Sequence, residues 1–137
     1  MDAYPDEARI IGAVMGEVAS RTGVATFYDP DGKAAPFYSV EYLGGERADT
    51  KTQFRELIRL RFHCVARPRD PYSPACAFGM ASRLKSALAE PFALPEGCGT
   101  LEDVRYAGVK AVNRDPSGEP HGVVDFDLVV GFGLRCK

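Results

Sequence analysis

The most regular hydrophobic pattern in the chain is the alternation of residues 121–136. One set of alternate positions is apolar throughout: Val124, Phe126, Leu128, Val130, Phe132 and Leu134. The intervening set includes acidic residues and glycines: Asp125, Asp127, Gly131 and Gly133. Successive side chains of a β-strand point to opposite faces, so a period of two predicts a strand. We expect its apolar face to pack in the core and its other face to meet solvent or another chain.

Residues 52–66 follow the same period less strictly. Their even positions are mostly apolar: Phe54, Ile58, Leu60, Phe62 and Cys64. Their odd positions include basic or titratable side chains: Arg55, Arg59, Arg61 and His63. Glu56 and Leu57 interrupt the alternation, and RELIRL is also compatible with a helix. Because no helix cap precedes the segment and the alternation continues to Ala66, a long strand is favoured.

Two segments have the period of an amphipathic helix. In residues 6–21, three apolar residues share one stripe: Ile10, Val14 and Val18. Acidic residues in the first turn favour the positive end of the helix dipole, and Gly23 is placed to end the helix. The second helix should begin with Ser73 at the N-cap and Pro74 at the first helical position. Its apolar stripe then runs toward Pro91: Ala77, Met80 or Ala81, Leu84 and Leu88.

The remaining segments complete an α+β fold. β-Branched and aromatic residues predict strands at 24–28 and 36–44, joined as a hairpin by the turn-forming residues between them. Residues 104–114 predict a further strand, which the turn DPSGEP connects to the last one. The element order is α-β-β-β-α-β-β, and it predicts a mostly antiparallel sheet with both helices packed on one face. We expect a single domain spanning residues 1–137.

The composition is that of a folded, water-soluble protein, because 45% of the residues are apolar and 26% are charged. No apolar run approaches the roughly 20 residues of a membrane span, and the acidic N-terminus does not resemble a secretory signal. We therefore expect the protein to stay in the cytoplasm of the cell that makes it. The cysteines lack the spacing of a metal site and are expected to be reduced, packed thiols without a cofactor: Cys64, Cys76, Cys98 and Cys136.

The charged residues are unevenly distributed along the chain. Residues 1–50 hold 4 basic and 9 acidic side chains, a net charge of −5, and residues 51–85 hold 8 and 2, a net charge of +6. Residues 86–137 hold 5 and 8, a net charge of −3, which brings the whole chain to −2. This total argues against a general nucleic-acid binder. Segments of opposite charge favour self-association.

The titratable residues do not form a recognisable catalytic motif. His63 and Cys64 are adjacent, so on a strand they point to opposite faces and cannot act together as base and nucleophile. We interpret His121 as a solvated turn residue. Asp125 and Asp127 share a strand face roughly 7 Å apart, as in a small metal-dependent enzyme, but no third ligand lies nearby in sequence. An enzyme is therefore the less favoured class.

The glycines do not form a phosphate-binding loop either. Neither GG at 44–45 nor GFG at 131–133 is followed by a helix or by the lysine of such a loop. Gly131 and Gly133 are better explained by close approach of backbone, or of a neighbouring chain, to one sheet face.

The basic row on residues 52–66 is the main candidate for a functional surface. One interpretation is a solvated face whose arginines pair across strands with Glu41, Asp125 or Asp127. The others are a subunit interface and a surface that faces a polyanion. Because exposed charges contribute little to folding, we expect the arginines to serve assembly more than stability. The interface hypothesis includes six residues: Arg55, Arg59, Arg61, His63, Asp125 and Asp127.

With its elements in this order, the chain resembles the tail terminator or tail-completion proteins of long-tailed bacteriophages. The similarity covers most of the chain, from the N-terminal helix through PFYSVEYLGGERADTKT, RELIRLRFHCVA and SPACAFGMASRLKSALAE to VNRDPSGEPHGVVDFDLVV. In that family a P-[YF]-x-x-[VL] strand commonly precedes a polar loop, and HG leads into an alternating final strand. The strongly basic middle and the loop with Cys98 and Gly99 depart from the family pattern.

The resemblance implies a structural protein of the virion tail or neck, without enzymatic activity. Such proteins form a homomeric ring, usually a hexamer, that ends the growth of the tail tube and joins it to the head. The implied partners are further copies of the chain, the tail tube and head-completion proteins, with DNA passing through the ring and assembly in the host cytoplasm. The departures leave a head-closure, neck or minor capsid subunit as the alternative.

Overall fold

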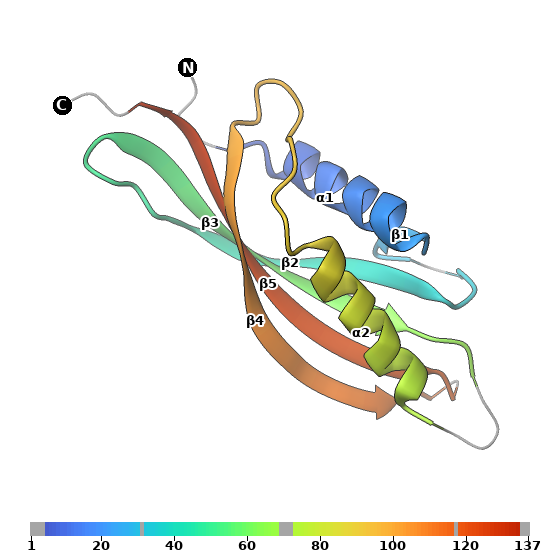
Figure 1. Ribbon diagram of the computed structural model, residues 1–137. Coiled ribbons are helices and arrows are strands. Elements are labelled where there is room, and N and C mark those ends of the chain that lie inside the picture. The colour runs from blue at the N-terminus through green and yellow to red at the C-terminus, as the bar shows by residue number, and fades with distance from the viewer. Residues whose placement is uncertain (1–4, 31, 69–72, 117, 135–137) are drawn as a thin grey trace.

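The computed structural model describes residues 5–30, 32–68, 73–116 and 118–134. Two helices, α1 (Glu7–Thr22) and α2 (Ala75–Ala87), cover one face of a five-stranded sheet, as Figure 1 shows. The strands are β1 (Thr26–Tyr28), β2 (Phe37–Arg47), β3 (Gln53–Val65), β4 (Thr100–Arg114) and β5 (Pro120–Leu134). The predicted α+β class and the order α-β-β-β-α-β-β are confirmed.

The sheet has the spatial order β1-β2-β3-β5-β4, so the last strand of the chain lies inside it. β3 and β5 are antiparallel along almost their whole length, from Gln53 opposite Leu134 to Val65 opposite His121. β2 with β3 and β4 with β5 are antiparallel as well. The sheet is therefore mostly antiparallel, as predicted, with its two edges formed by β1 and β4.

β1 differs from the prediction, because it does not form a hairpin with β2. The two strands are parallel, with Thr26 opposite Tyr38 and Tyr28 opposite Val40. A parallel pair usually needs a long crossover, since the chain must return to the starting end of the first strand. β1 has 3 residues and spans roughly 10 Å, so residues 29–36 are sufficient for the return. The turn-forming residues predicted a change of direction but not the path of the loop.

The helices bury the stripes that the sequence predicted. α1 follows an N-cap at Asp6, whose Oδ1 accepts a hydrogen bond from the Arg9 N–H at 3.3 Å, and it ends at Gly23 with φ +72°. In α2 the cap is Pro74 in place of Ser73, although the Ser73 Oγ accepts a hydrogen bond from the Ala75 N–H at 3.2 Å. The buried stripe residues come from both helices: Ile10, Val14, Val18, Ala77, Met80, Ala81, Leu84 and Leu88.

The core lies between these stripes and the apolar face of the sheet. The largest fully buried sheet residues are Tyr38, Ile58, Leu60, Phe62, Phe126 and Leu128. The Tyr38 hydroxyl donates a hydrogen bond to the Met80 carbonyl at 2.7 Å, which satisfies a buried polar group and ties β2 to α2. Leu134 was predicted on the same face but is 79% exposed, because this end of β5 extends beyond both helices in Figure 1.

The loop between α2 and β4 returns to the core through Cys98. This residue is 2% exposed and lies between Gly97 and Gly99, which both have φ +86°. A Cβ at Gly99 would collide with the backbone oxygen of Gly131, so the close approach of the loop to β5 requires glycine here. The loop that departs from the tail-terminator pattern is thus part of the packed core.

Candidate interaction face

The predicted charged residues lie together on the face of the sheet that is turned away from the helices. β3 and β5 are neighbours, and their register places Arg61 opposite Asp125 and Arg59 opposite Asp127. His63 lies opposite Val123 on the same face. All six residues of the interface hypothesis are therefore brought to one surface, which we call the outer face: Arg55, Arg59, Arg61, His63, Asp125 and Asp127.

One ion pair of the outer face, between Arg61 and Asp125, has two hydrogen bonds. The Arg61 Nε donates to Oδ1 at 2.9 Å and Nη2 donates to Oδ2 at 3.0 Å, a two-point contact that fits the planar guanidinium. Asp125 is the one charged residue that is buried among the described residues. The hydrogen bond with Asp125 raises the pKa of Arg61 above its ordinary value. This pair therefore links β3 to β5 within the subunit.

Arg59 makes looser and more exposed contacts. Its Nη2 lies 2.9 Å from the Glu46 Oε1 on β2, and its Nε lies 4.0 Å from the Asp127 Oδ1 on β5. The Arg59 side chain is 47% exposed and that of Glu46 is 56% exposed. Exposed pairs of this kind contribute no more than about 1 kcal/mol to stability. Arg59 is thus the arginine of the row that is best placed to contact another molecule.

Arg55 takes part in a polar bridge that crosses over β5. The Arg55 Nε lies 3.2 Å from the Glu102 Oε1 on β4, and the Gln53 amide is hydrogen bonded to the other Glu102 oxygen. Because β5 lies between β3 and β4, the bridge passes above Gly131, where a Cβ would collide with both the Glu102 carboxylate and the Gln53 amide. The predicted packing role of Gly131 is explained by this bridge.

Sequence reasoning missed Glu102. It lies at a register shift between Leu101 and Asp103, where the pairing of β4 with β5 gains an extra residue. Such a bulge redirects a side chain without leaving a trace in the hydrophobic alternation. No signal in the sequence placed Glu102 beside Gln53 and Arg55.

The two histidines of the chain are in contact on the outer face. His63 Nδ1 and His121 Nε2 are 2.9 Å apart, and His63 Nε2 lies 2.9 Å from the Glu41 Oε1. The interpretation of His121 as a solvated turn residue was wrong, because β5 begins at Pro120 and His121 is half-buried within it. Burial, and then the neighbouring His63, lower the pKa of His121, while Asp115 and Glu119 act in the opposite direction.

The structure separates the other candidates for chemistry. Cys64 lies on the core face, fully buried, while His63 lies on the outer face, and burial raises the pKa of the Cys64 thiol to about 12. Asp125 is engaged by Arg61. Within the described ranges, no three His, Cys, Asp or Glu side chains form a group that could hold a metal ion. Cys98 is buried and Cys76 is half-buried, while Cys136 lies outside the described residues.

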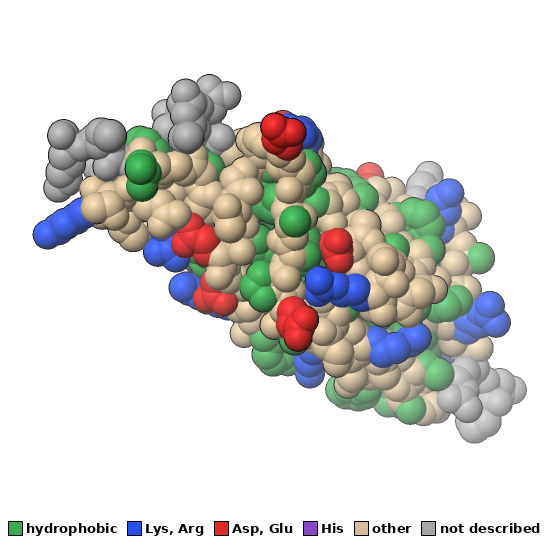
Figure 2. Space-filling view, turned by 45° about the horizontal axis from the view of Figure 1, so that its top comes forward, with side chains coloured by type: hydrophobic (Ala, Val, Ile, Leu, Met, Phe, Trp, Pro, Cys, Tyr) green, Lys and Arg blue, Asp and Glu red, His purple; other side chains and the backbone are tan. Residues whose placement is uncertain are grey.

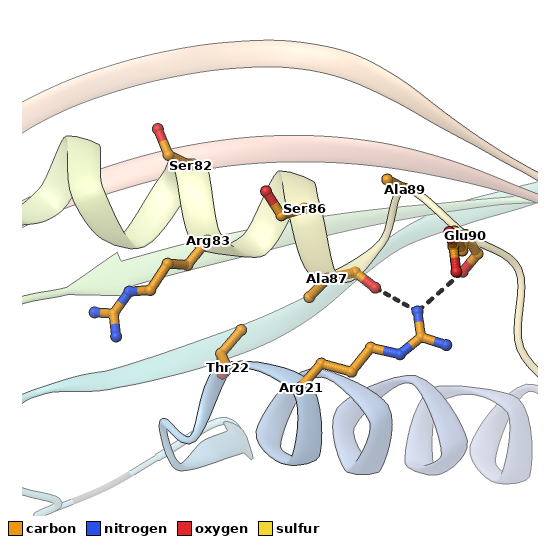
Figure 3. Close-up of a pocket in the computed structure, with 8 residues that line it drawn as sticks. All are labelled: Arg21, Thr22, Ser82, Arg83, Ser86, Ala87, Ala89 and Glu90. Carbon is orange, nitrogen blue, oxygen red and sulfur yellow. Dashed lines mark hydrogen bonds between the residues drawn. The ribbon is translucent and has the colours of Figure 1, made fainter.

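A hollow of about 600 Å³ lies between the C-terminal ends of the two helices (Figure 3). Arg21 of α1 reaches across it, and its Nη1 donates hydrogen bonds to the carbonyls of Ala87, at 2.6 Å, and Glu90, at 3.0 Å. These contacts satisfy carbonyls at and just beyond the end of α2, which have no partner within the helix. We therefore assign the Arg21 guanidinium to holding the two helix ends together.

The outer-face pairs cancel much of the charge asymmetry along the sequence. Arg61, Arg59 and Arg55 of the basic middle segment pair with carboxylates from the acidic N-terminal and C-terminal segments. Figure 2 shows the same mixing on another side of the molecule, where Lys and Arg side chains are interspersed with Asp and Glu. The pairs formed by these three arginines leave the outer face without a patch of single sign.

The fold and this face define a two-layer α+β domain whose polar chemistry is spread over a sheet surface. Among the described residues, neither helix is long and apolar enough to cross a membrane. No family model and no curated protein matches the chain. A solved structure described as "Virion of native gene transfer agent (GTA) particle" contains a chain of the same fold, with a TM-score of 0.65 and 18% sequence identity. The superposition covers 93% of this chain and 98% of that one.

Proposed function

We propose that the chain is a phage-like virion protein that forms a homomeric ring, acting as a tail terminator that caps the tail tube and joins it to the head. The observation that carries the proposal is the superposition on a chain of the gene transfer agent virion, which covers nearly all of both chains. A fold shared over 93% of this chain and 98% of that one supports a common domain. The sequence resemblance to tail terminators points in the same direction and supplies the specific role.

The outer face is consistent with a structural role in such a ring. Each of its three arginines is paired with a carboxylate, so the face presents a surface of mixed sign in place of a cleft with free catalytic groups. A surface whose arginines are matched by carboxylates has little excess charge to hold a polyanion. We therefore assign the outer face to contact with protein or to passive passage of DNA through the ring. Arg59 is its most exposed arginine among the three predicted ones.

The ring can be tested with the purified full-length chain. Size-exclusion chromatography with light scattering, followed by electron microscopy of the main peak, should give closed rings of several copies. A monomer at every protein concentration and ionic strength would overturn the proposal. Rings that bind the end of purified tail tubes and stop their elongation would support the terminator role.

A head-closure, neck or minor capsid subunit is the main competing function. The fold shared with a chain of the gene transfer agent virion does not by itself distinguish a tail terminator from these other virion proteins. Rings that bind isolated DNA-filled heads and leave tail-tube growth unchanged would favour the alternative. A metal-dependent enzyme using Asp125 and Asp127 would require Asp125 to leave its two-point contact with Arg61 before it could bind a metal ion.

A further inference from the structure

An apolar groove of about 390 Å³ opens between α1 and the β1 edge of the sheet. Its walls include Ile11, Met15, Tyr28 and Tyr42, and the Tyr28 side chain is 51% exposed. Among the described residues that line the groove, Glu7 is the one that carries a charge. Concave apolar surfaces with an exposed aromatic rim are typical of contact sites for other proteins.

The carboxylate of Glu7 gives this groove a negative charge without a matching cation. None of the ion pairs formed by the described residues includes Glu7. Its electrostatic neighbours are the Tyr42 phenol and the Glu56 carboxylate; burial and then the charge of Glu7 raise the pKa of both groups. A cation from another molecule would relieve this repulsion.

The opposite edge of the sheet carries the complementary features. Tyr106 of β4 is 50% exposed, and the Lys85 ammonium of α2 lies 4.8 Å from the centre of its ring. Phe78 is 51% exposed and precedes Lys85 by seven residues, close to two helical turns, so both lie on the same flank of α2. No ion pair of the described residues includes Lys85. Phe78, Lys85 and Tyr106 thus form an exposed aromatic surface, which we call the knob, with a half-buried ammonium that has no ion-pair partner among the described residues.

The β4 edge is poorly suited to pairing with another strand. Three register shifts interrupt its ladder with β5, at Leu101/Asp103, Tyr106/Gly108 and Val109/Ala111. Bulges of this kind twist an edge strand away from regular hydrogen bonding with a second strand. A contact at this edge therefore has to be made by side chains, which is what the knob provides.

We propose that the groove of one copy takes the knob of the next copy of this chain, with Tyr106 on the apolar wall and Lys85 paired with Glu7. This contact rests on the proposed ring and deepens it. β1 and β4 are the opposite edges of one sheet, so every copy carries a groove on one side and a knob on the other. A head-to-tail contact of this kind closes into a ring when its rotation divides a full turn. A free cation and a free carboxylate select a second copy over an uncharged apolar partner.

Charge reversal tests the contact on the full-length chain. Glu7→Lys and Lys85→Glu should each shift the rings to monomers, with the concentration for half-assembly rising at least tenfold. The double variant Glu7→Lys/Lys85→Glu should form rings again, because every contact then joins opposite charges. The equimolar mixture of the two single variants should form rings of an even number of copies in which the two variants alternate. Lys51→Glu makes the same charge change in the turn between β2 and β3 and should assemble as the unmodified chain does. Thermal unfolding by circular dichroism should show that every variant is folded.

The outcomes separate this contact from the proposed function. Rings that persist in both single variants would overturn the proposed contact but not the proposed ring. Disassembly in the single variants without recovery in the double variant would also overturn the Glu7–Lys85 pairing. A monomeric unmodified chain would overturn both the ring and the contact.

Discussion

Arg61 and Asp125 face each other across β3 and β5, and the guanidinium donates two hydrogen bonds to the carboxylate, at 2.9 and 3.0 Å. The Asp125 side chain is 11% exposed and that of Arg61 is 34% exposed. A carboxylate so nearly buried depends on its partner, because a charge left alone away from water is costly. Arg61 therefore contributes to the folded sheet, whereas the sequence placed all three arginines of the row in assembly.

Arg61→Ala should lower the free energy of unfolding by about 1 to 3 kcal/mol, because Asp125 loses both of its hydrogen bonds to the guanidinium. Arg59→Ala should lower it by less than about 1 kcal/mol, since Arg59 and Glu46 are both well exposed. Urea unfolding followed by circular dichroism measures both effects. Equal losses of stability in the two variants would show that the buried Arg61–Asp125 pair contributes no more than the exposed Arg59–Glu46 pair.

The phase of α2 can be tested with two neighbouring residues. Leu84 is fully buried in the core, so Leu84→Asp should place an unpaired charge there and lower the free energy of unfolding by more than about 4 kcal/mol. Arg83 is exposed and lies off the buried stripe, so Arg83→Asp should change the stability by less than about 0.5 kcal/mol. Thermal unfolding of the two variants compares them. Similar melting temperatures for Leu84→Asp and Arg83→Asp would contradict the observed helix phase.

Hydrophobic periodicity predicted most of the fold, because each long element buries one face. The alternation of β5 and the stripes of both helices follow directly from which residues must leave water. The same alternation placed Arg59, Arg61, Asp125 and Asp127 on one face before the strand order was known. The element order and the mostly antiparallel sheet follow from these local patterns.

The features of the fold that could not be predicted from the sequence depend on contacts between residues far apart in the chain. The parallel direction of β1 depends on the path of the loop at 29–36, and the contact of His63 with His121 depends on the register of β3 against β5. Leu57 and Val129 are buried although both lie on the outer face, opposite each other. Long charged side chains beside apolar residues can cover them in this way. A pattern that assigns alternate residues to core or solvent does not predict such burial on the outer face.

The bridge above Gly131 predicts a coupling between residues on adjacent strands. Gly131→Ala should lower the free energy of unfolding by about 1 kcal/mol or more, because the new methyl group would displace Glu102 and Gln53. In a background that carries Glu102→Ala, the same change should cost clearly less. A double-mutant cycle by urea unfolding measures this interaction. Additive effects of Gly131→Ala and Glu102→Ala would mean that the bridge does not confine residue 131.

The contact between His121 and His63 predicts how stability depends on pH. Burial and the neighbouring His63 lower the pKa of His121 in the folded state below its ordinary value of 6.5. As the pH falls below about 6.5, the unfolded chain therefore takes up a proton at this residue before the folded chain does, and the free energy of unfolding decreases. His121→Gln keeps a polar side chain but removes the titration.

The measurement is the difference in the free energy of unfolding between the unmodified chain and His121→Gln, followed from about pH 7 to about pH 5. Carboxylates such as Glu56 titrate in both proteins, so their contribution largely cancels in the difference. We expect the unmodified chain to lose more stability than the variant over this range, because only the unmodified chain carries His121 with its lowered pKa. If the two proteins lose stability in parallel, or if the variant loses more, protonation of His121 is not opposed by its burial against His63.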